Sequence, residues 1–175
     1  AYTYHSNGQL KERVLFFGET PDSYYAEHNN IFILYTYAYD AKGRIASDTN
    51  HYIGGLAIDS NRSIQSYTEY TYDDKNRIVS EKIVFPRWNF SQVNTYEYGA
   101  DGNLVGGVYD KNVNPLRLSK VLAFIAKDYS VNNRTGDDLT YEYNKYKLPV
   151  KITGSSNVLA GHYGAGTFNI TYIKK

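Results

Sequence analysis

The chain has 175 residues, the size of one domain, and we expect a single β-repeat domain over residues 1–175. Its 19 Lys and Arg against 18 Asp and Glu give a net charge of +1, which excludes a strongly basic nucleic-acid-binding protein. The absence of Cys excludes disulfides and cysteine nucleophiles. The longest apolar run, residues 121–126, is far shorter than the roughly 20 residues of a membrane-spanning helix.

Tyrosine is the informative excess in the composition. The chain contains 20 Tyr but only 7 Phe and 1 Trp. Tyrosine favours strands, and its hydroxyl needs water or a hydrogen-bond partner. Together with 14 Gly and 4 Pro, which favour turns, this composition predicts an all-β protein.

In chain order, one pattern recurs five times. Its clearest copy reads Tyr37-Ala-Tyr39-Asp40-Ala-Lys-Gly43-Arg44-Ile45, with two tyrosines, a turn and an aliphatic residue. The five copies cover residues 2–10, 37–45, 70–78, 96–104 and 141–148, and the last is one residue shorter. The unequal spacing indicates one kind of hairpin with variable insertions.

The turn chemistry of the pattern predicts its register. Asp40 and Gly43 suit a type I turn followed by a left-handed residue, which makes a three-residue hairpin loop with a bulge. The second tyrosine of each copy then faces the aliphatic residue across the hairpin. The expected pairs are Tyr4–Leu10, Tyr39–Ile45, Tyr72–Ile78, Tyr98–Leu104 and, around a two-residue loop, Tyr143–Leu148. Asp40–Arg44 and Asp73–Arg77 should form exposed ion pairs on the opposite face; a recognition strip is the alternative.

Between the repeats, short turns join strongly β-forming runs. We expect about eleven strands, over residues 1–5, 9–17, 31–40, 44–53, 64–73, 77–86, 91–99, 103–110, 138–144, 148–154 and 166–174. The simplest topology for them is an antiparallel up-and-down meander. Because open edges are a liability, the sheet should be strongly curved or form an incomplete barrel.

One segment breaks the β pattern. Asn114 and Pro115 suit the start of a helix, and an apolar face follows at Leu118, Val121, Leu122 and Ile125. The spacing predicts a short helix near residues 116–127. A strand over residues 121–126 is the competing interpretation.

The sequence shows no catalytic constellation, and we predict no catalytic residues, no metal site and no cofactor. His5, His28, His51 and His162 lack metal-ligand spacing. The candidate ligand-binding residues are Arg87 and Trp88, which lie in an irregular segment after Pro86. An exposed Trp beside an Arg can serve as a platform for a sugar or a peptide. The alternative is a Trp that folds back and anchors its own loop.

The hairpin pattern resembles two known groups. Residues 37–45 and 70–78 are similar to the tyrosine–aspartate repeats of Rhs-type wall and toxin proteins. Residues 109–115, 131–133 and 141–152 resemble secreted lipoprotein domains of gut Bacteroidetes, a family of unknown function with a porin-like fold. This resemblance implies export and tethering at the cell envelope through a lipidated cysteine upstream of Ala1. It implies no catalytic residues.

We therefore expect an extracytoplasmic binding or structural module of a cell-envelope lipoprotein, without catalysis. Its partner would be a glycan or a cell-surface protein, with no nucleic acid and no transmembrane segment in the chain. Two alternatives remain open: a glycoside hydrolase or other hydrolase using scattered carboxylates, and a fragment of a repeat shell.

Overall fold

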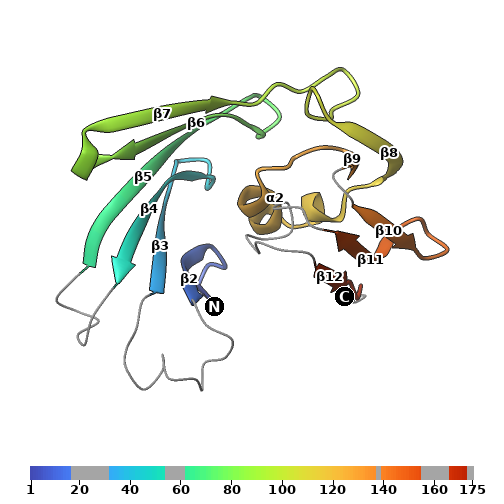
Figure 1. Cartoon of the computed structure of the whole chain (residues 1–175), viewed down its shortest axis with the longest axis horizontal. Coiled ribbons are helices and arrows are strands. Elements are labelled where there is room, and N and C mark those ends of the chain that lie inside the picture. The colour runs from blue at the N-terminus through green and yellow to red at the C-terminus, as the bar shows by residue number, and fades with distance from the viewer. Residues whose placement is uncertain (17–31, 54–61, 137–138, 155–165, 173–175) are drawn as a thin grey trace. The chain divides into compact units, whose positions relative to one another are not determined.

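The structure is a computed structural model that describes residues 1–16, 32–53, 62–136, 139–154 and 166–172 (Figure 1). The chain divides into two compact units, Ala1–Thr95 and Tyr96–Lys175. We describe each unit separately. The expectation of one domain over residues 1–175 stays a prediction.

The first unit is one antiparallel sheet whose seven strands follow each other in chain order. The strands are β1 (Tyr2–Tyr4), β2 (Leu10–Phe16), β3 (Phe32–Tyr39), β4 (Ile45–Ile53), β5 (Arg62–Tyr72), β6 (Ile78–Phe85) and β7 (Phe90–Thr95). Figure 1 shows that the sheet twists strongly from β3 to the long β6–β7 hairpin. This is the predicted up-and-down meander, and its edges are β1 and β7.

The second unit holds two smaller antiparallel sheets and the helical segment. Strands β8 (Val108–Val113) and β9 (Asn132–Thr135) form a pair, while β10 (Thr140–Tyr143), β11 (Pro149–Gly154) and β12 (Gly166–Asn169) form a three-stranded sheet. The all-β antiparallel class is therefore confirmed. The described strands form three separate sheets.

Four predicted tyrosine–aliphatic pairs are confirmed. Tyr4, Tyr39 and Tyr72 face Leu10, Ile45 and Ile78, and an isolated bridge joins Tyr98 to Leu104. In each of the first three hairpins a register shift follows the tyrosine–aliphatic pair, so a bulge lies just beyond the turn.

The prediction for the fifth hairpin is wrong. Tyr143 faces Pro149, not Leu148, and Lys147 takes the left-handed position at φ 59°. Asn144 and Leu148 close the turn through main-chain hydrogen bonds, as Asp40 and Arg44 do in the second copy. All five copies therefore have the same loop length. Proline, which has no N–H, is tolerated here because it sits at a bulge.

The short helix is confirmed, but its predicted apolar face is wrong. The segment is split into a 3-10 turn η2 (Pro115–Leu118) and a helix α2 (Lys120–Ala126). Extended Ser119 separates them and caps α2, so the two parts do not share one helical phase. In consequence Ala123 and Phe124 are buried, whereas Leu118 is 61% exposed.

Two strand boundaries also differ from expectation. Residues 132–135, which lie outside the expected strands, form β9 opposite β8. The strand expected over residues 103–110 is interrupted, because residues 105–107 turn and β8 begins only at Val108. The structure describes residues 166–172 of the last expected strand, and β12 covers the first four of them.

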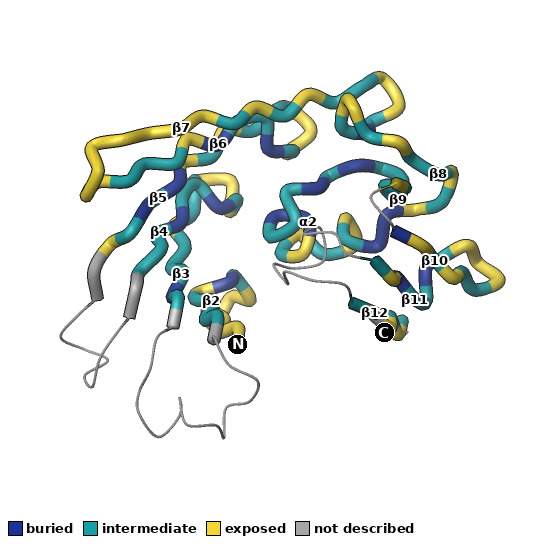
Figure 2. The backbone as a smooth tube through the Cα atoms, viewed as in Figure 1, coloured by how far each residue is buried: buried dark blue, intermediate teal, exposed yellow. Residues whose placement is uncertain are grey.

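The buried core of the first unit contains the aliphatic residues that follow the turns. Leu10, Ile45 and Ile78 are all at most 7% exposed, and Leu34 joins them in the core. Figure 2 shows that β4 and β5 contain buried positions, whereas β7 is exposed over most of its length. In the second unit Leu139 and Ile152 form a small cluster with Tyr141 and Ile170. Each of the first three turns thus places one apolar side chain in the core.

Candidate functional site

The carboxylates of Asp40 and Asp73 accept hydrogen bonds from residues of their own turns. Oδ1 of Asp73 accepts the main-chain N–H groups of Lys75 and Arg77 at 3.0 and 2.8 Å. Its Oδ2 accepts Nε and Nη2 of Arg77, both at 2.7 Å. Asp40 binds Lys42 and Arg44 in the same manner. With every strong acceptor direction used, these carboxylates are structural rather than available for a ligand.

The two ion pairs are less exposed than predicted. The Asp73 and Arg77 side chains are each 17% exposed. The guanidinium of Arg44 lies 4.5 Å from the ring centre of Tyr72, and its Nη1 donates to Asn76 at 3.1 Å. Burial raises the pKa of Asp73, but hydrogen bonds from the Arg77 main chain and side chain outweigh it, so the pKa lies below its ordinary value. The Asp40–Arg44 pair thus links the second hairpin to the third.

Three tyrosine hydroxyls reach back to a neighbouring hairpin. Tyr39 Oη donates to the Leu10 carbonyl and Tyr72 Oη to the Ile45 carbonyl, both at 2.7 Å. Tyr172 Oη makes the same bond to the Pro149 carbonyl at 2.8 Å in the second unit. In each case the acceptor is the residue at the aliphatic position of the preceding hairpin.

Three charged residues hold equivalent positions in the first three hairpins and lie on one face of the sheet. The residue three positions after each aliphatic residue lies opposite the first tyrosine of its own hairpin. These pairs are Arg13–Tyr2, Asp48–Tyr37 and Glu81–Tyr70. Because opposed side chains share a face and alternate along a strand, Arg13, Asp48 and Glu81 lie on the same face. We call these three residues the charged row.

The two acids of the charged row are nearly buried. Asp48 is 7% and Glu81 is 8% exposed. Tyr70 Oη donates to Asp48 Oδ2 at 2.5 Å, and Asn94 Nδ2 donates to Glu81 Oε1 at 2.8 Å. Burial, followed by the charge of Asp48, raises the pKa of Tyr70 far above its ordinary value. Tyr70 therefore stays protonated and donates to the carboxylate.

The predicted site residues, Arg87 and Trp88, lie in an exposed turn between β6 and β7. The turn is the 3-10 element η1 (Pro86–Trp88), and it ends at Asn89 in the left-handed conformation. Trp88 is 62% exposed, although its ring centre lies 5.6 Å from that of Phe85. The Trp packs on its neighbour and still presents much of its surface to solvent.

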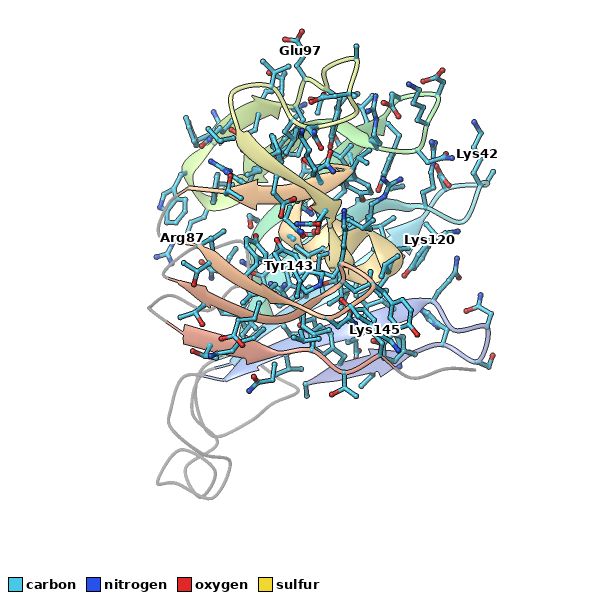
Figure 3. The ribbon with its side chains drawn as sticks, turned by 90° about the vertical axis from the view of Figure 1, so that its right-hand side faces the viewer. Lys42, Arg87, Glu97, Lys120, Tyr143 and Lys145 are labelled. Atoms are coloured by element: carbon cyan, nitrogen blue, oxygen red, sulfur yellow. The ribbon has the colours of Figure 1, made fainter. Side chains whose placement is uncertain are left out.

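Phe90 extends this exposed surface. Its ring stacks on Phe85 at 5.9 Å and is 55% exposed. Figure 3 shows Arg87 at the periphery of the ribbon. We call Phe85, Arg87, Trp88 and Phe90 the aromatic corner. It is an exposed apolar surface beside a cation, which suits stacking on a flat or weakly polar ligand.

The second unit contains a buried polar network that the sequence reading missed. Asp110 accepts N–H groups from the main chains and side-chain amides of Asn112 and Asn133, and the hydroxyl of Tyr143 (labelled in Figure 3). Burial opposes ionisation of Asp110, but these hydrogen bonds hold its pKa below the ordinary value. Burial and the bond to Asp110 raise the pKa of Tyr143 to about 12. The network joins β8, β9 and β10.

A second cluster ties together the two ends of the helical segment. Asn114 is 2% exposed and donates to Asp128 Oδ2 at 3.1 Å and to the Ser130 carbonyl at 3.3 Å. Asp128 Oδ1 in turn accepts the Ser130 N–H at 2.8 Å. The sequence signal for both clusters is Asp followed two residues later by Asn or Ser, since such side chains bind the main chain two residues on.

No metal centre emerges from the described residues. Within them, no group of three or more His, Asp or Glu side chains could hold a metal ion. Two of the histidines considered in the sequence, His28 and His162, lie outside the described residues. The described residues also include no helix with the length and apolar character needed to cross a bilayer.

A scan against protein-family models finds no match, and a search of curated proteins finds no significant relative. The resemblances to lipoprotein domains and to tyrosine–aspartate repeats therefore stay predictions. The site is defined by the geometry of this chain alone.

Proposed function

We propose that the protein is an extracytoplasmic binding module of a cell-envelope lipoprotein that uses the aromatic corner to bind a glycan and performs no catalysis. The observation that carries the proposal is the exposure of Trp88 and Phe90, at 62% and 55%, around the half-buried Phe85. Large exposed apolar side chains that gather in one place mark interaction sites. The C–H face of a pyranose ring packs on such a surface, and Arg87 supplies hydrogen-bond donors beside it.

The single Trp makes this proposal directly testable. Because Trp88 is the one Trp of the chain, its emission reports on the aromatic corner alone. Glycans that bind on a printed array should shift Trp88 emission in solution, and Trp88→Ala should abolish array binding. Tyr146→Ala is a matched control, since Tyr146 is 71% exposed in the turn of the fifth hairpin. Blank arrays, or binding that survives Trp88→Ala, would remove the glycan role; binding to a cell-surface protein at the same corner is then the outcome to measure.

A hydrolase is the second candidate, and the charged row is the observation that favours it. Asp48 and Glu81 are nearly buried carboxylates on one face, with β5 between their strands. Two strand spacings and an offset of two residues along β5 separate their main chains by about 12 Å, so the carboxylates can reach toward a common substrate. Turnover of a polysaccharide that Glu81→Gln abolishes and Glu69→Gln, at an exposed position, leaves intact would establish this function. A repeat-shell fragment would require many further hairpins in the full-length gene.

A further inference from the structure

Three side chains of the β6–β7 hairpin are joined by hydrogen bonds beside the aromatic corner. Gln92 Nε2 donates to Asn94 Oδ1 at 2.8 Å, and Asn94 Nδ2 donates to Glu81 Oε1 at 2.8 Å. We call these three residues the amide relay. Because side chains alternate along a strand, Phe90, Gln92 and Asn94 lie on one face of β7, and Glu81 lies opposite Asn94 on the same face. The amide relay therefore runs from a nearly buried carboxylate to the edge of the aromatic corner.

The carboxylate of Glu81 sets the direction of both amides. An ionised carboxylate accepts hydrogen bonds and cannot donate them, so Asn94 turns its NH2 group to Glu81 and its oxygen to Gln92. Gln92 in turn directs its NH2 group to that oxygen. The oxygen of Gln92, Oε1, is left for another donor, and the Gln92 side chain is exposed. The hairpin thus presents a hydrogen-bond acceptor of fixed direction next to Phe90.

The polar groups before and after Phe90 have opposite hydrogen-bonding character. Arg87 carries donors only, whereas the amide relay makes Gln92 present an acceptor. An acetamido group matches both, because its carbonyl accepts, its N–H donates and its methyl group can pack on an aromatic ring. A sugar hydroxyl gains less from a fixed acceptor, since it can rotate toward water instead. A carboxylate or a sulfate has no donor to offer Gln92.

We infer that Gln92 belongs to the glycan-binding site and that the glycan carries acetamido groups, as N-acetylhexosamines do. This assignment rests on the proposed function, because it needs a glycan held at the aromatic corner. The acetamido N–H donates to Gln92 Oε1 while the methyl group packs against Phe90. Glu81 does not contact the glycan; it is a positioning residue that orients Gln92 through Asn94.

Two oligosaccharides that differ in one substituent test this selection. A chito-oligosaccharide carries an acetamido group where a cello-oligosaccharide of equal length carries a hydroxyl. In titrations of the full chain followed by Trp88 emission, the chito-oligosaccharide should bind about tenfold more tightly, the worth of about one hydrogen bond. Gln92→Leu should remove most of this preference and leave the affinity for the cello-oligosaccharide nearly unchanged. Ser91→Ala, at the adjacent exposed position on the other face of β7, is the matched control and should keep the preference.

A pair of substitutions at Glu81 tests the positioning role. Glu81→Leu removes the acceptor that orients Asn94, so the preference for the chito-oligosaccharide should fall. Glu81→Gln keeps an acceptor at this place and should retain most of the preference. Circular dichroism of both variants, compared with the wild type, shows whether the sheet is intact. A preference that persists in Glu81→Leu would overturn the positioning role.

The outcomes separate this inference from the proposed function. Equal affinity of the wild type for the two oligosaccharides, or a preference that survives Gln92→Leu, would overturn the inference and leave glycan binding at the aromatic corner standing. The same holds if neither oligosaccharide binds while other glycans bind on the array in a Trp88-dependent manner. Blank arrays together with no binding in solution would remove both.

Discussion

At the scale of single residues, the turn carboxylates contribute most to their own hairpins. Asp73 accepts two main-chain N–H groups and a two-point contact from Arg77. Asp73→Ala should lower the free energy of unfolding by about 1–3 kcal/mol, because these donors lose a charged acceptor. Urea denaturation measures the change. Its neighbour Asp74 is exposed, so Asp74→Ala should change stability by less than about 0.5 kcal/mol, and equal losses would contradict this account.

The turn residues were predictable, whereas the buried acids were not. Asp40, Gly43 and Asn76 follow from local backbone chemistry, which the sequence contains in full. Burial of Asp48 and Glu81 depends on which sheet face is covered, and strand alternation alone does not decide this. The exposure of Trp88 likewise depends on how its turn packs against Phe85.

At the scale of elements, the lateral tyrosine bonds join the hairpins. Tyr72→Phe removes the hydrogen bond to the Ile45 carbonyl and leaves that acceptor unsatisfied. The free energy of unfolding should fall by about 1–3 kcal/mol. Tyr4→Phe is the matched control, because Tyr4 holds the equivalent place in the first hairpin but is 53% exposed. A loss from Tyr4→Phe as large as that from Tyr72→Phe would show that the hydroxyls do not act through these bonds.

The left-handed turn position gives a prediction with opposite signs in two hairpins. Lys147 has φ 59° and Gly43 has φ 72° at equivalent places. Lys147→Gly should stabilise the protein and Gly43→Ala should destabilise it, each by about 1 kcal/mol, because side chains strain this conformation. Thermal unfolding of the two variants beside the wild type measures both changes. Shifts of the same sign would refute the equivalence of the two turns.

Some predictions for individual strands and helices were wrong because local sequence signals competed or because the pairing was non-local. In the fifth hairpin, Leu148 and Pro149 both suit the position opposite Tyr143, and the observed bulge selects the proline. In the helical segment, the extended Ser119 resets the phase of the apolar pattern. Pairing of β8 with β9 is non-local, and the segment that contains α2 separates the two strands in sequence.

At the scale of the whole molecule, the buried tyrosines should limit stability at high pH. Burial raises the pKa values of Tyr37, Tyr70 and Tyr141 above 10.0, and that of Tyr143 to about 12. The unfolded chain loses these protons first, near pH 10, so the free energy of unfolding should fall as the pH rises above about 10.

A spectroscopic titration checks this expectation. Phenolate absorbance should rise in two steps, with exposed tyrosines ionising first and the buried group ionising together with the loss of circular dichroism. Tyr70→Phe should reduce the second step and flatten the pH dependence of stability. A single step without unfolding would contradict the raised pKa values.

The class of the whole fold was predictable because it rests on repeated local chemistry. Tyrosine-rich hairpins in sequence order dictate an antiparallel meander, and the seven-stranded sheet follows it. The division into three sheets was not predictable, since it depends on non-local pairing such as that of β8 with β9. The positions of Arg87 and Trp88 in an irregular turn were foreseen, because Pro86 ends the strand before them.

The hydroxyl of Tyr72 reaches back to the hairpin before it, and so does that of Tyr39. Because each of these bonds points to the preceding hairpin, the sheet can be lengthened by whole hairpins. A duplicate of the second hairpin, spliced in ahead of the third, would find an acceptor carbonyl behind it and offer one in front. An inserted hairpin of this kind should therefore leave the existing tyrosine–carbonyl bonds unchanged.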